Sequence, residues 1–172
     1  LDIDFAKPWQ RLDLLSAIES ECGVRPDELS DLETAKSAMT RVGLAGHNEN
    51  NLGGVIEKLL EHFVEPTLQQ PTFIVNYPIE TSPLAKKHPD NPRLTRRFEG
   101  YVRGREVCNA FSEINDPIDQ RERFEQQLGE RAKGDDEAHP MDEDFIYALE
   151  SGMPPTGGCG IGIDRLAMTL TG

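Results

Sequence analysis

The sequence predicts an α+β fold. Helical periodicity dominates the first 70 residues, whereas strand-like runs gather after Pro71 and do not alternate regularly with helices. This segregation is typical of α+β domains, because a doubly wound sheet needs strands and helices in alternation. A length of 172 residues suits one domain and is enough for a hydrophobic core. We therefore expect a single domain with a mainly helical part over 1–70 and a sheet part over 71–172.

Three helices are predicted in the first part. Leu14 to Glu21 carries apolar residues at helical spacing, and Asp31 can cap a second helix that runs through Val42 and stops at Gly43. The polar cluster at 46–51 predicts a loop. The strongest helical pattern covers Leu52 to Pro66. We expect these helices to pack against a sheet and to carry no chemistry.

Strands dominate the next part. Thr72 to Val75 is rich in β-forming residues, and prolines on both sides make it a short strand. Residues 81–92 contain three prolines and predict an ordered loop. Apolar and polar residues then alternate over 98–102 and 106–113, on either side of Arg103-Gly104, which predicts an antiparallel hairpin.

Two helices and a last strand complete the predicted order. Asp116 can cap a helix that begins at Pro117 and closes at 134–137. The expected buried stripe of this helix is Phe124, Leu128 and Ala132, and that of the next helix is Phe145, Ala148 and Leu149. Gly158 to Ile163 predicts the final strand, followed by the start of a helix.

Composition and charge exclude several classes of protein. Hydrophobic residues make up 37% and charged residues 28%, which fits a globular protein without a membrane span or signal peptide. Cys22, Cys108 and Cys159 are too far apart in sequence for a zinc motif, and they suit a reducing cytoplasm. The net charge of −13 argues against nucleic-acid binding by this segment itself. It suits a cationic ligand with a divalent metal, and it also suits plain solubility.

The most informative stretch is the glycine-rich run from Thr156 to Leu166. Glycines in a strand often mark a place where another group approaches the backbone closely, here Gly158, Gly160 and Gly162. Arg165 follows at the predicted corner between strand and helix, where its planar fork can meet a phosphate or stack on a ring. A nucleotide site is one interpretation of this pattern. A tightly packed strand of small residues is the other.

The hairpin carries two candidate groups of ligands. Glu99 and Glu106 lie on opposite arms, and Mg²⁺ commonly takes one or two carboxylates together with substrate phosphates. Asn109, Phe111 and Glu113 share one strand face and could form a pocket for a long cationic side chain, whose ammonium must be paired when buried. Alternatively, the first two are solvated carboxylates, Phe111 is core and Glu113 is rim.

Strict alternation creates a conflict in this assignment. Glu106 and Asn109 have opposite parity, so a regular strand would place their side chains on opposite faces. If Glu106 lines the same site as Asn109 and Glu113, one extra residue must interrupt the pairing. We therefore predict a bulge near Val107-Cys108, with the Glu99 and Glu106 carboxylates roughly 4–7 Å apart around a shared magnesium.

Four blocks in order resemble the class II lysyl-tRNA synthetases over nearly the whole chain. They are NYPIETSPLAK at 76–86, RFEGYVRGREVCNAFSE at 97–113, EINDPIDQ at 113–120 and TGGCGIGIDRL at 156–166. The resemblance implies an antiparallel sheet flanked by helices. It implies that Glu99 and Glu106 hold Mg²⁺, that Asn109, Phe111 and Glu113 bind L-lysine, and that Arg165 is a catalytic residue. In this family the arginine contacts ATP phosphate and stacks on adenine over a floor formed by the three glycines.

The resemblance also shows what is missing. Nothing here matches the first signature motif, which builds the dimer interface, or the second, whose arginine binds the substrate carboxylate and the ATP α-phosphate. The anticodon-binding domain has no counterpart either. We therefore expect the carboxy-terminal part of a catalytic domain, with an incomplete sheet and no activity alone. The parent enzyme is expected to be a cytoplasmic homodimer that acts on L-lysine, ATP and tRNA(Lys). A paralogue that modifies a translation factor and a non-catalytic binding module derived from a synthetase remain alternatives.

Overall fold

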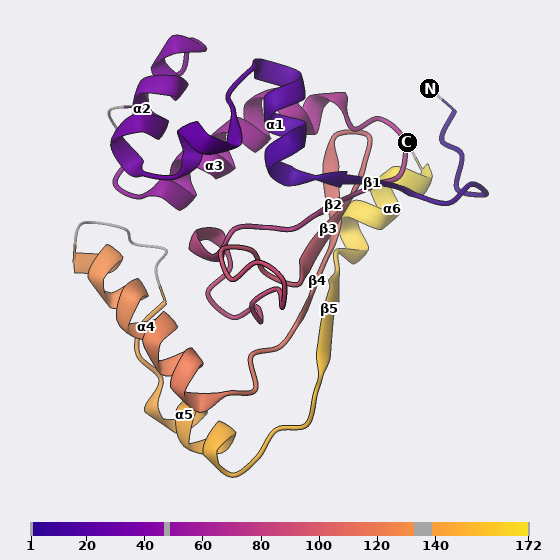
Figure 1. Cartoon of the computed structure of the whole chain (residues 1–172). Coiled ribbons are helices and arrows are strands. Elements are labelled where there is room, and N and C mark those ends of the chain that lie inside the picture. Colours follow the sequence, from indigo (N-terminus) through magenta and orange to yellow (C-terminus); the bar gives the residue numbers. More distant parts are fainter. Residues whose placement is uncertain (1, 47–48, 133–138, 172) are drawn as a thin grey trace.

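The computed structural model describes residues 2–46, 49–132 and 139–171 and contains one five-stranded sheet (Figure 1). The strands follow one another across the sheet in chain order, β1 to β5. β1 pairs with β2 in parallel, and all later pairs are antiparallel. The strands are β1 (Gln10–Asp13), β2 (Thr72–Val75), β3 (Arg97–Val102), β4 (Arg105–Ser112) and β5 (Gly157–Ile161). The α+β prediction is therefore confirmed.

Helices surround this sheet in three groups. In Figure 1, the helices of the first 60 residues lie together, the helices after β4 lie apart from them, and the last helix lies against β4. They are α1 (Leu14–Cys22), α2 (Leu32–Arg41), α3 (Leu52–Leu59), α4 (Pro117–Ala132), α5 (Glu143–Glu150) and α6 (Ile163–Thr171). None of the helices within the described residues is both long and apolar enough to cross a membrane.

The predicted caps form as expected. Asp31 accepts a hydrogen bond from the Thr34 backbone N–H, and Gly43 follows the helix with φ of 90°. Asp116 accepts from the N–H of Ile118 and precedes α4. These contacts satisfy backbone donors that a helix start leaves without an intrahelical partner. The predicted loop at 46–51 and the predicted helix end at 134–137 lie partly or wholly outside the described residues.

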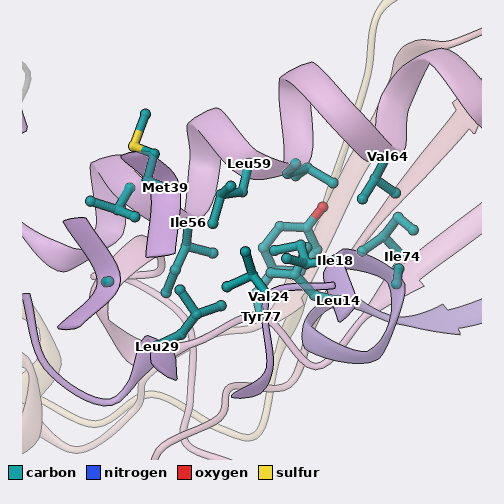
Figure 2. Close-up of a cluster of buried hydrophobic side chains, with 14 of the residues drawn as sticks. Leu14, Ile18, Val24, Leu29, Met39, Ile56, Leu59, Val64, Ile74 and Tyr77 are labelled. Atoms are coloured by element: carbon teal, nitrogen blue, oxygen red, sulfur yellow. The ribbon is translucent and has the colours of Figure 1, made fainter. Parts of the chain in front are cut away.

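The main core joins the first helices to the sheet (Figure 2). Leu14 and Ile18 of α1, together with Ile56 and Leu59 of α3, meet Ile74 of β2 there. Each of these side chains is at most 2% exposed, so the core is closely packed. Because this core joins the first 70 residues to β2, it holds that strand in place beside the hairpin.

Two local predictions differ from the structure. β1 lies within the part expected to be mainly helical, and it pairs with β2 across some sixty residues of chain. The predicted 52–66 helix consists of α3, a π-helical turn over Leu60–Val64 and a 3₁₀ turn over Glu65–Thr67. Proline at position 66 cannot continue an α-helix, which accounts for the change in its last turns. The division of the chain into a mainly helical part over 1–70 and a sheet part over 71–172 stays a prediction.

The expected stripes of α4 and α5 are partly wrong. Leu128 and Ala132 are exposed, whereas Gln120, Arg123 and Phe124 are buried. All the buried residues of α4 lie in its first half, so the helical spacing predicted the stripe correctly only as far as Phe124. In α5 the buried residues are Ile146 and Leu149, while Phe145 and Ala148 are exposed.

β5 forms one edge of the sheet and is mostly exposed. Apolar side chains on β5 and α6 also face solvent: Ile161, Ile163, Met168 and Leu170. Cys159 on β5 is exposed as well. An unpaired strand edge offers free backbone donors and acceptors. This region agrees with the expectation of an incomplete sheet.

Candidate active site on the hairpin and the last strand

A bulge brings the candidate residues to one face of the sheet. Gly100 pairs with Cys108 and Tyr101 pairs with Glu106, so Val107 is the extra residue on β4. This confirms the predicted irregularity between Glu106 and Asn109. A bulge of one residue reverses the parity of the strand. Residues across the two strands then share one face: Arg97, Glu99, Tyr101, Glu106, Asn109 and Phe111.

The bulge also helps to place the glycine-rich segment. Its Val107 carbonyl accepts a hydrogen bond from the N–H of Gly162 at 2.9 Å. The Gly162 carbonyl in turn accepts from the Leu166 N–H at the start of α6. The bulge in β4 is thus hydrogen-bonded to the corner where β5 turns into α6.

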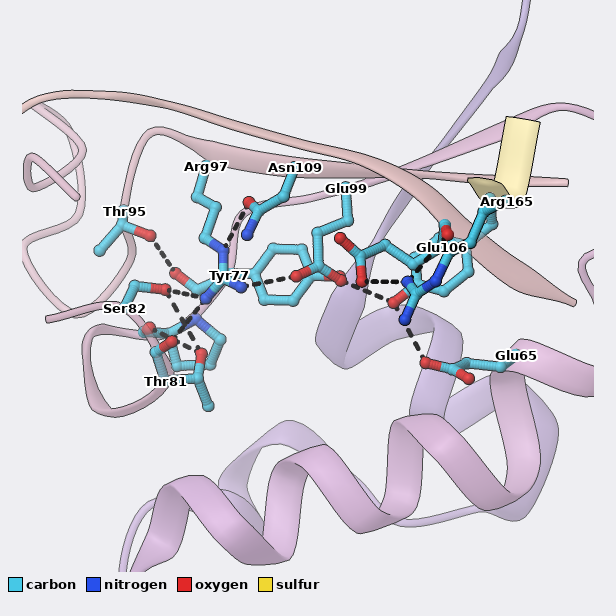
Figure 3. A network of polar contacts seen from close by, with 12 residues as sticks. Glu65, Tyr77, Thr81, Ser82, Thr95, Arg97, Glu99, Glu106, Asn109 and Arg165 are labelled. Carbon is cyan, nitrogen blue, oxygen red and sulfur yellow. Dashed lines mark hydrogen bonds and ion pairs between the residues drawn. The ribbon is translucent and has the colours of Figure 1, made fainter. Parts of the chain in front are cut away.

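Glu99 is the centre of a buried polar network (Figure 3). One carboxylate oxygen, Oε1, accepts from Nη2 of Arg97 at 2.5 Å. The other, Oε2, accepts from the hydroxyls of Tyr77 and Tyr101, both at 2.6 Å. A carboxylate has about four lone-pair positions, so three of these are already used. The Glu99 side chain is therefore held in one orientation.

Burial keeps the two tyrosines protonated. It raises the pKa of Tyr77, with the adjacent Glu99 carboxylate as the next cause. Burial likewise raises the pKa of Tyr101, followed by the nearby Tyr77 and Glu99. Both hydroxyls remain donors at any physiological pH, because a buried phenolate beside a carboxylate would be strongly unfavourable.

Glu106 forms an ion pair with Arg165. Nη1 of Arg165 donates to the Glu106 Oε2 and to its backbone carbonyl, both at 2.9 Å. The arginine side chain is 52% exposed, so the pair lies at the surface and can exchange partners. Such a pair brings the candidate phosphate-binding cation and a candidate metal-binding carboxylate into direct contact.

A third carboxylate borders this region. Glu65 follows the π-helical turn, and its Oε1 lies 3.2 Å from the Tyr101 hydroxyl, whose single proton it shares with the closer Glu99. Burial raises the pKa of Glu65; the Tyr101 hydrogen bond opposes this shift, and the negative charges of Glu61, Glu99 and Glu106 add to it. The proximity of these carboxylates favours the binding of a cation.

The carboxylate oxygens on this face fit a magnesium ion that takes its remaining ligands from substrate phosphates. Glu99 keeps one free lone-pair position and Glu106 keeps Oε1, which suits one oxygen from each carboxylate. Within the described parts of the chain, no three His, Cys, Asp or Glu residues form a group that could hold a metal. A protein-only site is thus not present there, whereas Mg²⁺ commonly takes further oxygens from substrate phosphates and water.

The residues expected to bind lysine lie at the other end of the same face. Asn109 and Phe111 are half-buried, which fits neither a core position nor a freely solvated one. On β5 they pair with Gly160 and Gly158, so the neighbouring strand carries no side chains at these positions. A Cβ added at Gly158 would overlap Oε1 of Glu113. The glycine at 158 therefore makes room for the Glu113 carboxylate, a role that the sequence did not suggest.

Burial raises the pKa of the Glu113 carboxyl. The Glu113 carboxyl consequently binds its proton more readily in the folded chain than in the unfolded chain. At neutral pH the folded chain holds this group as a partly desolvated carboxylate, which lowers the free energy of unfolding. Stability associated with Glu113 is present at low pH and is lost as the pH rises through the pKa of the folded state. A cationic ligand at this carboxylate would offset the cost.

We therefore expect Glu113→Gln to raise the melting temperature of the 172-residue chain at pH 7.5. The difference from the original chain should shrink toward zero near pH 4, where the original Glu113 is largely protonated in both states. Thermal unfolding at several pH values checks this, with Glu125→Gln on the exposed side of α4 as control. A variant that is less stable than the original at pH 7.5 would contradict the assignment of a desolvated carboxylate.

Sequence reasoning missed several members of the network, among them Tyr77, Ser82, Arg97 and Tyr101. Parity alone could have indicated Arg97 and Tyr101, because both alternate with Glu99 on β3. Tyr77 and Ser82 come from the loop after β2, and no local pattern places them beside the hairpin. Cys108 lies on the opposite face of the sheet, where its sulfur would be 2.6 Å from a Cβ at Gly100. Burial raises the pKa of its thiol, which makes it a poor nucleophile.

The family described as tRNA synthetases class II (D, K and N) matches residues 1–172. The chain therefore belongs to the class II tRNA synthetases, and its α+β fold agrees with this. Among individual proteins, the chain is 55% identical over 169 residues to Lysine–tRNA ligase of Moorella thermoacetica. That similarity covers 98% of this chain and 35% of the relative.

Two further relatives have the same name. Lysine–tRNA ligase of Staphylococcus haemolyticus is 54% identical over 170 residues, covering 99% of this chain and 34% of that protein. The protein from Chloroflexus aurantiacus is 49% identical over 170 residues, covering 99% of this chain and 35% of its own length. The chain thus spans about a third of the length of these relatives.

Proposed function

We propose that this chain supplies part of the active site of a lysine–tRNA ligase. The enzyme would activate L-lysine with ATP, giving lysyl-adenylate and pyrophosphate, and then transfer the lysyl group to tRNA(Lys). The observation that carries this proposal is the shared face of β3, β4 and β5. It presents a desolvated carboxylate at one end and an arginine with two further carboxylates at the other.

Different residues of this face would bind different parts of the two substrates, lysine and ATP. Glu113 would pair with the ammonium of the lysine side chain, and Phe111 would form the wall along the aliphatic part of that side chain. Asn109 would bind a polar group of the lysine substrate. Arg165 would leave Glu106 to contact ATP phosphate and adenine. Gly158, Gly160 and Gly162 would let the nucleotide approach the backbone.

The chemistry needs no protein nucleophile. The lysine carboxylate attacks the α-phosphorus of ATP and pyrophosphate leaves, so the protein contributes orientation and charge stabilisation. Mg²⁺ held by Glu99 and Glu106 would neutralise phosphate charge. The fixed orientation of Glu99 and the ion pair of Glu106 prepare both carboxylates for that role before the substrate binds.

The remaining properties of the enzyme are proposed from the family. We place it in the cytoplasm as a homodimer with Mg²⁺ and ATP. A net charge of −13 on this segment means that tRNA would be held mainly by other parts of the enzyme.

Amino-acid-dependent ATP–pyrophosphate exchange tests the proposal. The protein to use is the longer enzyme, meaning a synthetase that contains this 172-residue segment. We expect exchange with lysine and none above background with asparagine or aspartate. Exchange that lysine does not stimulate would refute the proposed function.

A further inference from the structure

The guanidinium of Arg97 connects the two ends of the site (Figure 3). Its Nε donates to Oδ1 of Asn109 at 3.1 Å, and its Nη2 donates to Oε1 of Glu99 at 2.5 Å. One residue therefore touches both a candidate lysine-binding side chain and a candidate magnesium ligand. Its side chain is only 15% exposed, so these contacts are shielded from water.

The third nitrogen of Arg97 fixes the loop that follows β2. Nη1 donates to the Thr81 carbonyl at 2.5 Å and to the Ser82 hydroxyl at 3.1 Å. The guanidinium carbon also lies 4.7 Å from the centre of the Tyr77 ring. Because all three nitrogens and one ring face are in use, Arg97 is held in a single position.

This position determines how Asn109 faces the pocket. Its Oδ1 already accepts from Arg97, so the amide presents its N–H₂ group as the donor to a ligand. The same guanidinium occupies one lone-pair position of Glu99 and sets which part of Oε1 stays open. A lysine side chain has a point charge and could not reach Asn109, Glu99 and the loop together.

We infer that Arg97 is a positioning residue that orients the amino-acid pocket and the magnesium-binding carboxylate together. It touches neither substrate and acts through Asn109 and Glu99. This inference rests on the proposed function, since it concerns how that site is organised. Its particular consequence is that one conservative change at Arg97 impairs the use of lysine and of Mg²⁺ at the same time.

Arg97→Lys in the longer enzyme tests the inference by pyrophosphate exchange. We expect the KM for lysine and the Mg²⁺ concentration for half-maximal activity each to rise by about tenfold or more, because a charge-assisted hydrogen bond to each side is lost. Glu113→Gln should raise only the lysine constant. Tyr101→Phe, which removes one donor to Glu99, should raise only the Mg²⁺ constant.

Two further variants guard against a general effect on folding. Arg96→Lys, on the adjacent exposed residue, should leave both constants unchanged. Ser82→Ala removes one contact of the guanidinium while keeping Arg97, and it should raise both constants by a smaller factor than Arg97→Lys. This variant preserves the test if Arg97→Lys does not fold.

A purely structural role for Arg97 predicts a different pattern. In that case Arg97→Lys would lower the melting temperature or kcat and leave the two constants at their original values. That result, or a rise in only one constant, would overturn the inference while the proposed function stands. If the unmodified enzyme shows no lysine-dependent exchange, both the function and the inference fail.

Discussion

Replacing Glu113 with glutamine in the longer enzyme is expected to weaken lysine recognition far more than ATP binding. The ammonium of bound lysine would keep its desolvation cost and lose its charged partner. Leaving one member of a buried charge pair unmatched costs about 2–5 kcal/mol, or roughly 30- to 5,000-fold in affinity. Equilibrium binding of lysine and of an ATP analogue to the variant provides the measurement.

Glu125→Gln serves as the matched control for this experiment, because Glu125 lies exposed on α4. It removes the same charge from a solvated position and should leave both affinities unchanged. If Glu113→Gln altered lysine affinity by less than about threefold, or roughly 0.6 kcal/mol, Glu113 would not be the partner of the ammonium.

The isolated 172-residue chain is expected to show no lysine-dependent pyrophosphate exchange. No arginine in it matches the second signature motif of the family, and the chain spans about a third of its relatives. In the structure, β5 forms an exposed edge of the sheet and α6 carries exposed apolar residues. An active site that lacks the arginine for the substrate carboxylate and α-phosphate loses both positioning and charge stabilisation.

The assay for this prediction compares the isolated chain with the longer enzyme at equal concentration. Activity in the longer enzyme establishes that the conditions support the reaction. Lysine-dependent exchange by the isolated chain would show that these residues suffice for activation, contrary to the expectation.

Sequence reasoning worked best where short-range rules decide the structure. The caps at Asp31 and Asp116 depend on a side chain and a backbone N–H within a few residues. The hairpin follows from alternation around Arg103-Gly104, where both turn residues have positive φ. The bulge at Val107 was predictable, because a regular strand would place Glu106 and Asn109 on opposite faces, whereas the expected site needs both on one face.

Long-range packing produced the misses. β1 is only four residues long and is stabilised by parallel pairing with β2, which no local pattern reveals. Helical spacing placed Leu128 in a buried stripe, yet Leu128 is exposed and the buried residues of α4 all lie in its first half. That half buries Arg123, whose Nη2 has no hydrogen-bond partner among the described residues.

The candidate site was predictable as a set of residue types and less so as a network. Glu99, Glu106, Asn109 and Phe111 share a face, and Glu113 lies over Gly158. What the sequence could not indicate is how their orientation is fixed. Arg97 depends on the strand register for its contacts, and Tyr77 depends on a loop that returns to the hairpin from β2.

A crystal structure of the longer enzyme with lysine and a non-hydrolysable ATP analogue would test the central claim most directly. The account predicts the lysine ammonium about 2.7–2.9 Å from a Glu113 carboxylate oxygen. It also predicts Arg165 released from Glu106 and bound to the nucleotide, with Glu99 still held by Tyr77 and Tyr101. Lysine bound elsewhere, with Glu113 facing solvent and Arg165 still paired with Glu106, would contradict it.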